Sequence, residues 1–381
     1  AKIVDDLTAA EACNLPEKYT EANKCKGDAN IFVTSQAVKA TLASVYMSMA
    51  GYPLNETENY AKASDKALEV VKAVNERGVQ TLLNDWKEVY NYGNNYSKEC
   101  ILGLFYNTNY GSWATDDSQL SSCHVIQYYD SWQGWGDFLA ERKFWAEYPE
   151  GPRKDAVYGK NVDWWATKDG KPVAKDKSNA VISDFRPMFL GFSVNEEDKN
   201  KPYDCTKPNY AGMCLDKTHQ LIRYSEVICW LAEAAGRSGK NVAEAKAEFK
   251  KLRQRAYSDP AAVSAVDGMS NNALADAAFN EHRYEVAGNV LGMVTCREDE
   301  FRLNKLKDVH ADRKNQNKVL IPKGTLTHSE DAEGNAFTYT TTEDLVFEEE
   351  MKVESAWNGE NSMYNIYPPV QVEKNPNLVR K

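Results

Sequence analysis

The residues of this 381-residue chain that are best suited to chemistry lie in one stretch, from Asn107 to Tyr148. Tryptophan and tyrosine alternate there with aspartate, asparagine, glutamine and serine, and the stretch has loop character up to about Gly136. A sugar ring has one apolar C–H face and a rim of hydroxyls, so its binding sites combine exposed aromatic rings with planar amide and carboxylate groups. The stretch has the composition of such a face, with these candidate ligand-binding residues: Trp113, Asp117, Gln127, Tyr128, Tyr129, Asp130 and Trp132.

Other aromatic residues of this region have a structural alternative. Trp135, Phe138 and Trp145 follow one another at spacings of three and seven, which fits the apolar stripe of a helix. We therefore expect these three mainly in the core. Trp164 and Trp165 form a reserve candidate for ligand binding, and one of the two is expected to be buried because adjacent residues of an extended segment face opposite ways.

Catalysis is the main alternative to simple binding. Glycoside hydrolysis needs two carboxylates that flank the scissile bond, and several aspartates lie near tryptophans, namely Asp116, Asp117, Asp130 and Asp137. With 56 acidic residues in the chain, however, such neighbours arise readily. The sequence contains no Gly-x-Ser-x-Gly elbow, no GxGxxG fingerprint and no Walker loop. It therefore predicts a binding protein and not an enzyme.

Composition and charge argue against several other classes. The formal net charge is -10 and the basic residues are scattered, so we expect no nucleic-acid partner. No run approaches the roughly 18 consecutive apolar residues that a membrane-spanning helix needs. There is no CxxC pair and no histidine at zinc-ligand spacing, so no metal and no cofactor is expected. Calcium bound by oxygen ligands near Asp116 and Asp117 remains an open alternative.

Six of the eight cysteines fall into two kinds. Loop-like sequence separates the members of two pairs, which suits short disulfides in an oxidising compartment: Cys13 with Cys25, and Cys205 with Cys214. Cys229 and Cys296 lie in apolar helical patterns, where we expect free buried thiols that behave as small hydrophobic residues.

Apolar residues at helical spacing predict the elements that position these groups. The first helix spans 34–50, with Thr34 or Ser35 as its cap, Gly51 as its end and an apolar stripe of Val38, Leu42, Val45, Tyr46 and Met49. A second helix follows at 59–78, and further helices are predicted at 218–236, 241–257 and 271–288. The helix pairs, with small residues where they cross, are similar to tetratricopeptide repeats.

The sequence thus predicts a mainly α protein of tetratricopeptide-like helix pairs with a loop-rich insertion and a few short strands. We expect one domain over 1–381, with the first helical pairs in 1–98, the insertion and its ligand face in 99–217, and a second helical part with a C-terminal segment in 218–381. The closing stretch, 318–381, is expected to lie on the helical body. Because the chain begins with Ala1, we also expect an N-terminal portion to precede it.

Four separated segments resemble the SusD/RagB family. The segment LLNDWKEVYNYGNNYSKECILGLFYN is similar to the family's short tryptophan-containing helix and the strand that follows it. LIRYSEVICWLAEAAGRSG is similar to its Arg-Tyr-Ala-Glu-Val helix, and FNEHRYEVAGNVLGMV resembles its glutamate- and arginine-rich signature as far as Gly288. The closing IYPPVQVEKNPNL resembles the family's C-terminal motif. The charged residues of these motifs are expected to form structural salt bridges with partners one turn away, among them Arg223, Glu226, Glu281, Arg283 and Glu285.

The resemblance implies a fold and a function. Members of the family have a helical superhelix, bind nutrients at the cell surface and deliver them to a SusC-like TonB-dependent transporter of the outer membrane. By this resemblance the ligand is an oligosaccharide, or a peptide in the RagB branch. A helical-repeat scaffold for protein partners is a further alternative. Members of the family are attached to the outer membrane by an N-terminal lipid anchor, so the resemblance implies a location on the outer membrane surface. We expect that anchor in the N-terminal portion that precedes this chain.

Overall fold

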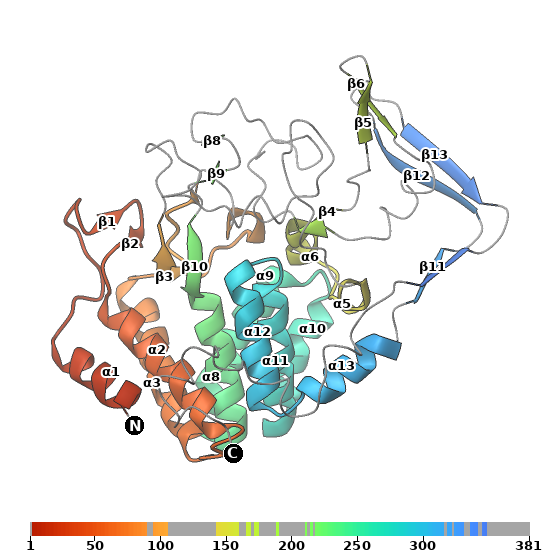
Figure 1. Ribbon diagram of the computed structural model, residues 1–381. Helices are drawn as coiled ribbons and strands as arrows, with labels where there is room; N and C mark the ends of the chain where they lie inside the picture. Colours follow the sequence, from red (N-terminus) through yellow and green to blue (C-terminus); the bar gives the residue numbers. More distant parts are fainter. Residues whose placement is uncertain are drawn as a thin grey trace, which may run out of the picture.

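The computed structural model describes residues 2–89, 94–105, 142–159 and 218–315, together with isolated short strands (Figure 1). These strands are β5 (Trp165–Lys168), β6 (Lys171–Ala174), β7 (Met188–Phe189), β8 (Tyr210–Ala211), β9 (Cys214–Leu215), β11 (Lys318–Ile321), β12 (Gly324–Glu330), β13 (Ala336–Thr341) and β14 (Leu345–Glu348). Within the described ranges the chain is mainly helical, as predicted from the sequence.

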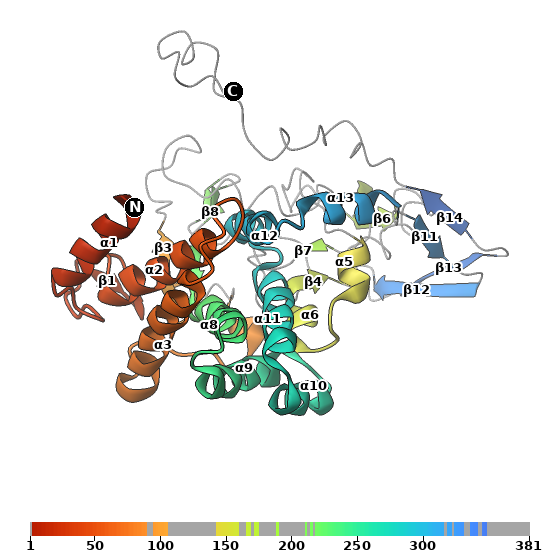
Figure 2. The ribbon, with the colours of Figure 1, turned by 90° about the horizontal axis from the view of Figure 1, so that it is seen from below.

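The helical body places consecutive helices side by side (Figures 1 and 2). Its helices are α1 (Lys2–Ala12), α2 (Ser35–Ala50), α3 (Asn59–Arg77), α8 (Tyr224–Ser238), α9 (Val242–Ala256), α10 (Pro260–Ser264), α11 (Asn271–Val286), α12 (Val290–Arg302) and α13 (Leu306–Asn315). α2 pairs with α3 and α8 with α9, while α8 also packs against α3 and α11. The predicted tetratricopeptide-like pairing is therefore confirmed.

The predicted ends of the first two helices agree closely with the structure, whereas the predicted buried face of α2 agrees only at Val38 and Leu42. The Thr34 hydroxyl accepts a hydrogen bond from the Ala37 amide, and α3 ends at Gly78 in the left-handed conformation (φ 63°). The core face of α2 consists of Ala37, Val38, Ala40, Leu42, Ala43, Met47 and Ala50, so the predicted Val45, Tyr46 and Met49 are only half-buried. Alanines bring α2 close to its neighbours, and their weak apolar signal explains the error.

Small residues also allow the close approach of α8 and α11. A Cβ atom on Gly236 would lie 2.4 Å from the Asn271 carbonyl oxygen, which is too close for any residue that has a side chain. On the other side of α8, Ala63 and Ala67 of α3 are completely buried in the same core. α8 is thus the central helix, with fully buried side chains facing neighbours on more than one side.

Residues 219–223 form a strand, which corrects the prediction that a helix begins at Thr218. β10 (His219–Arg223) pairs antiparallel with β3 (Cys100–Leu104), the strand expected from the sequence. Residues His219, Gln220, Ile222 and Arg223 of β10 are buried, so a tertiary partner more than 100 residues away decides the conformation of a segment that contains no helix breaker. A short hairpin joins β1 (Cys25–Lys26) to β2 (Ala29–Asn30).

Two further predictions are corrected by the structure. Cys13 and Cys25 are free thiols that donate hydrogen bonds to the carbonyls of Ala9 and Glu21, so they are not paired. Cys229 is free and buried, as expected, and Cys296 is free; burial raises the pKa of the Cys229 thiol. Cys205 lies outside the described residues. The closing stretch was expected on the helical body, but its described strands, β11–β14, lie beyond α13 to the side of the helices (Figures 1 and 2). Residues 349–381 of that stretch lie outside the described residues.

None of the described helices is both long and apolar enough to cross a membrane.

Candidate functional site

The predicted ligand residues belong to a segment that lies outside the described residues. This applies to Trp113, Asp117, Gln127, Tyr128, Tyr129, Asp130 and Trp132, and also to Trp135, Phe138 and Trp164. Trp165 is described only by its backbone, which pairs with Ala174 in the hairpin of β5 and β6. The structure nevertheless fixes the residues on both sides of the segment, Phe105 and Arg142, and these two ends define where the candidate site is attached.

The N-terminal attachment is the pair of β3 and β10. Cys100 lies opposite Arg223 and Leu104 opposite His219, and the Tyr224 amide donates to the Glu99 carbonyl at 2.9 Å. Residues 99–105 therefore enter the insertion from a strand whose partner leads directly into α8. In Figure 1 this pair stands at the upper end of the helical body, as do α5 (Arg142–Glu147) and α6 (Pro152–Val157).

A buried network of charges ties these ends to the bundle. Glu99 accepts two hydrogen bonds from Arg255 at 2.6 and 3.1 Å, and lies 3.2 Å from the Arg223 guanidinium. Glu285 contacts Arg153, Arg223 and Arg255 at 2.8 to 3.3 Å. All of these side chains are at most 3% exposed, so each charge must be compensated by its neighbours.

Electrostatics inside the network favour the ionised carboxylate. Burial alone would raise the pKa of Glu285, but the guanidinium groups of Arg255, Arg153 and Arg223 hold it well below its usual range. Trp86 of the short helix η1 (Trp86–Val89) donates its indole N–H to Glu285 at 3.1 Å. The expected salt bridging of Arg223 and Glu285 is confirmed, but their ionic partners lie on other elements and not one turn away.

The C-terminal attachment is an arginine among three tyrosines. Arg153 of α6 is completely buried, and its guanidinium carbon lies 5.4 to 5.5 Å from the ring centroids of Tyr148, Tyr257 and Tyr284. Its Nη1 atom contacts Glu281 at 2.6 Å, so one side of the guanidinium meets carboxylates and its faces meet rings. Trp145 is half-buried and packs against the apolar cluster that contains Trp86 and Tyr148, which confirms the packing role expected for it.

A second buried network lies deeper between α8, α11 and α12. The His282 ring lies 2.5 Å from Asp299 and 3.2 Å from Glu226, and Arg302 bridges Asp299 and Glu233. The Trp230 ring also contacts the His282 ring edge-on, with 5.7 Å between the ring centroids. Burial alone would lower the pKa of His282, but the carboxylates of Asp299 and Glu226 raise it to about 10.

We expect this histidine to make stability depend on pH. Its pKa is about 10 in the folded protein and 6.5 in the unfolded chain, so the folded state binds the extra proton. The stabilisation is fully present below pH 6.5. It is lost as the pH rises from 6.5 towards about 10, by at most about 1.4 kcal/mol per pH unit. Urea unfolding across this range measures it, and His282→Gln should flatten the dependence. Equal slopes for both proteins would contradict the assignment.

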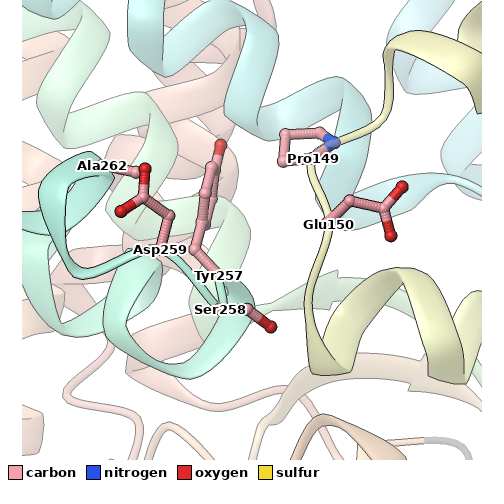
Figure 3. Close-up of a pocket in the computed structure, with 6 residues that line it drawn as sticks. All are labelled: Pro149, Glu150, Tyr257, Ser258, Asp259 and Ala262. Carbon is pink, nitrogen blue, oxygen red and sulfur yellow. The ribbon is translucent and has the colours of Figure 1, made fainter.

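A shallow, open depression of about 430 Å³ occurs where the insertion meets the bundle. It is lined by Pro149, Glu150, Tyr257, Ser258, Asp259 and Ala262 (Figure 3). The Glu150 carboxylate points away from Asp259, so the two do not form the facing pair that glycoside hydrolysis requires. The Tyr257 hydroxyl donates to Glu281 at 2.8 Å and is therefore engaged in the interior. The depression marks a joint between two parts of the fold more than a site for chemistry.

No cluster of three or more metal-ligating side chains occurs within the part of the chain that the structure describes.

Comparison with known proteins shows which fold the chain shares and which family model one of its regions matches. The chain aligns over 98% of its length with a SusD superfamily protein from Parabacteroides distasonis, at 18% identity and a TM-score of 0.60, covering 66% of that protein. A SusD homolog from Bacteroides thetaiotaomicron aligns over 81% of the chain and 61% of its own length, at 17% identity and a TM-score of 0.63. The chain thus spans less than two thirds of these two relatives.

A sequence model of the SusD family matches residues 201–290, the region of β10, α8, α9 and α11. The family model therefore covers one region of the chain, and the fold is shared with SusD superfamily structures. A further similar structure, at 17% identity and a TM-score of 0.62, was solved with a xylogluco-oligosaccharide and aligns over 99% of this chain and 70% of its own. No curated protein matches the sequence.

Proposed function

We propose that this chain binds an oligosaccharide without cleaving it and presents it to a SusC-like TonB-dependent transporter. The observation that carries the proposal is the aromatic and polar stretch from Asn107 to Tyr148, whose flanking residues are fixed on the SusD fold at one end of the bundle. Rings held on a rigid scaffold lose little conformational entropy when a ligand binds. The similarity to a protein solved with a xylogluco-oligosaccharide supports a glycan over other ligands.

Binding is tested with an array of oligosaccharides and peptides probed with the whole chain. We expect retention of one or a few glycans and no change in their mass after long incubation. Retention of peptides alone would favour a RagB-like peptide binder, and shortened glycans would show hydrolysis. Retention of neither would leave the helical-repeat scaffold as the better account and would overturn the proposal.

The place in the cell follows from the same proposal. A protein that delivers glycans to an outer-membrane transporter must stand on the cell surface, and we propose that an N-terminal lipid anchors it there. Purification of the native protein from membranes in mild detergent tests the partnership. Recovery of the lipidated protein without any TonB-dependent transporter would contradict it.

A further inference from the structure

An aromatic pair stands where β3 enters the segment of the proposed ligand face. The rings of Tyr96 and Phe105 stack with 5.9 Å between centroids and 11° between planes. Both side chains are half-buried, so each keeps part of its surface in contact with solvent. Phe105 lies two residues before Asn107, so this pair stands at the N-terminal end of the stretch that carries the sugar-binding candidates.

The β1–β2 hairpin holds Tyr96 in place. Gly27, at the turn of the hairpin, has φ 55°, and a Cβ atom there would lie 2.9 Å from the Tyr96 Cβ. The Asp28 amide donates to the Tyr96 carbonyl at 3.0 Å. Two features of one turn thus fix the backbone of Tyr96, so the stacked pair is ordered before any ligand arrives.

Positive charge gathers at this aromatic pair. The exposed Lys26 donates from its Nζ to the Tyr96 hydroxyl at 2.8 Å, and the same atom lies 4.4 Å from the ring centroid. No carboxylate among the described residues lies within ion-pair distance of Lys26. Lys18 and Lys98 each approach Asp28 at 3.8 Å, so they share one carboxylate. Lys26 thus adds a third ammonium group beside a pair of lysines that already share one carboxylate, in a chain whose net charge is -10.

We propose that Phe105, Tyr96 and Lys26 form a subsite for an anionic sugar residue, one that carries a carboxylate or a sulfate group. The ring of the sugar would lie against the aromatic pair, and its anionic group would pair with the Lys26 ammonium, which has further N–H donors besides the one given to Tyr96. The inference rests on the proposed glycan binding and specifies its substrate class. A neutral glycan would gain only the stacking, and an anionic one would gain the charge contact as well.

Calorimetry with matched ligands tests the subsite. The carboxylate arm compares an oligogalacturonate with its methyl ester, and the sulfate arm compares a sulfated galactan oligosaccharide with its desulfated form. We expect one of the two anionic ligands to bind about fivefold more tightly than its neutral counterpart, as for a solvent-accessible ion pair. The preference should fade in about 0.5 M salt because screening weakens exposed charge pairs.

Lys24 provides a matched control on the same segment. Its Nζ also lies over a tyrosine ring, that of Tyr19 at 5.3 Å, but it is already paired with Glu21 at 3.0 Å. Lys26→Met should abolish the anionic preference, whereas Lys24→Met should keep it. Phe105→Ala should weaken both members of the preferred pair about tenfold while the melting temperature stays near that of the wild type.

The outcomes separate this inference from the proposed function. If neutral and anionic glycans bind equally, or if Lys26→Met and Lys24→Met behave alike, the subsite is wrong and glycan binding stands. Should no glycan of any charge bind, including those on the array, both proposals fall together. A Phe105→Ala variant that melts early but binds normally would also overturn the subsite.

Discussion

Replacement of Glu285 by alanine should lower the free energy of unfolding by about 3 to 5 kcal/mol, the largest stability loss that we expect from a single carboxylate. In the folded protein, Glu285 compensates Arg153, Arg223 and Arg255 simultaneously, and all of these groups are inaccessible to solvent. Removal of the carboxylate leaves three buried cations facing two remaining glutamates, Glu99 and Glu281. Urea unfolding, with circular dichroism to follow the helices, measures the loss.

Glu17 offers a control with the same chemistry at the surface. It accepts two hydrogen bonds from Arg77 at 2.6 and 2.7 Å, but the two side chains are 28% and 46% exposed. Glu17→Ala should therefore cost less than about 1 kcal/mol. If Glu285→Ala does not accumulate as folded protein, Glu285→Gln keeps the shape and removes only the charge. Equal losses at Glu285 and Glu17 would show that the buried network does not stabilise the fold.

The composition of this network marks the limit of sequence reasoning. The types of Arg223, Glu281 and Glu285 indicate structural salt bridges, and that expectation is correct. Periodicity along one helix, however, can identify only partners three or four residues away. Glu285 is 62 residues from Arg223 and 132 from Arg153, and such partners become visible only when the fold brings α6, β10 and α11 together.

Helices were easier to predict than the strand that joins the two halves. Thr34 and Gly78 act locally, through a side-chain cap and a left-handed backbone, so their effect can be inferred from the neighbouring residues alone. β10 has no such local signal, because its conformation depends on β3. The ligand residues themselves were inferred from composition between Asn107 and Tyr148, and their contacts stay a prediction.

The two buried attachments explain how a loop-rich insertion could hold a binding face. Glu99, before β3, and Arg153, in α6, stand on either side of the 106–141 segment, and they meet in one charge network through Glu285 and its arginines. Both ends of the segment are therefore fixed to β10, α9 and α11. This scaffold holds the two ends of the segment and contributes no ligand contact itself. Substitutions within the 106–141 segment should therefore change affinity more than stability.

Trp113→Ala and Trp132→Ala are accordingly expected to weaken glycan binding about thirtyfold each and to leave the fold intact. Loss of a tryptophan that stacks on a sugar face often costs about 2 kcal/mol at a binding hot spot, which corresponds to that factor in affinity. The polar candidates Asp117, Gln127 and Asp130 should have smaller effects, because each contributes one hydrogen bond to a hydroxyl that water can replace. Calorimetry with the best glycan from the array measures the affinities.

Trp145 is the control for this prediction, because it packs half-buried against the apolar cluster that contains Trp86 and Tyr148, and Lys154 lies 5.0 Å from its ring. Trp145→Ala should lower stability by about 2 kcal/mol and leave the affinity of the folded protein unchanged. Melting curves for all three variants separate the two kinds of tryptophan. Wild-type binding by Trp113→Ala and Trp132→Ala, or unfolding of both, would place the sugar platform elsewhere, with Trp164 and Trp165 as the next residues to replace.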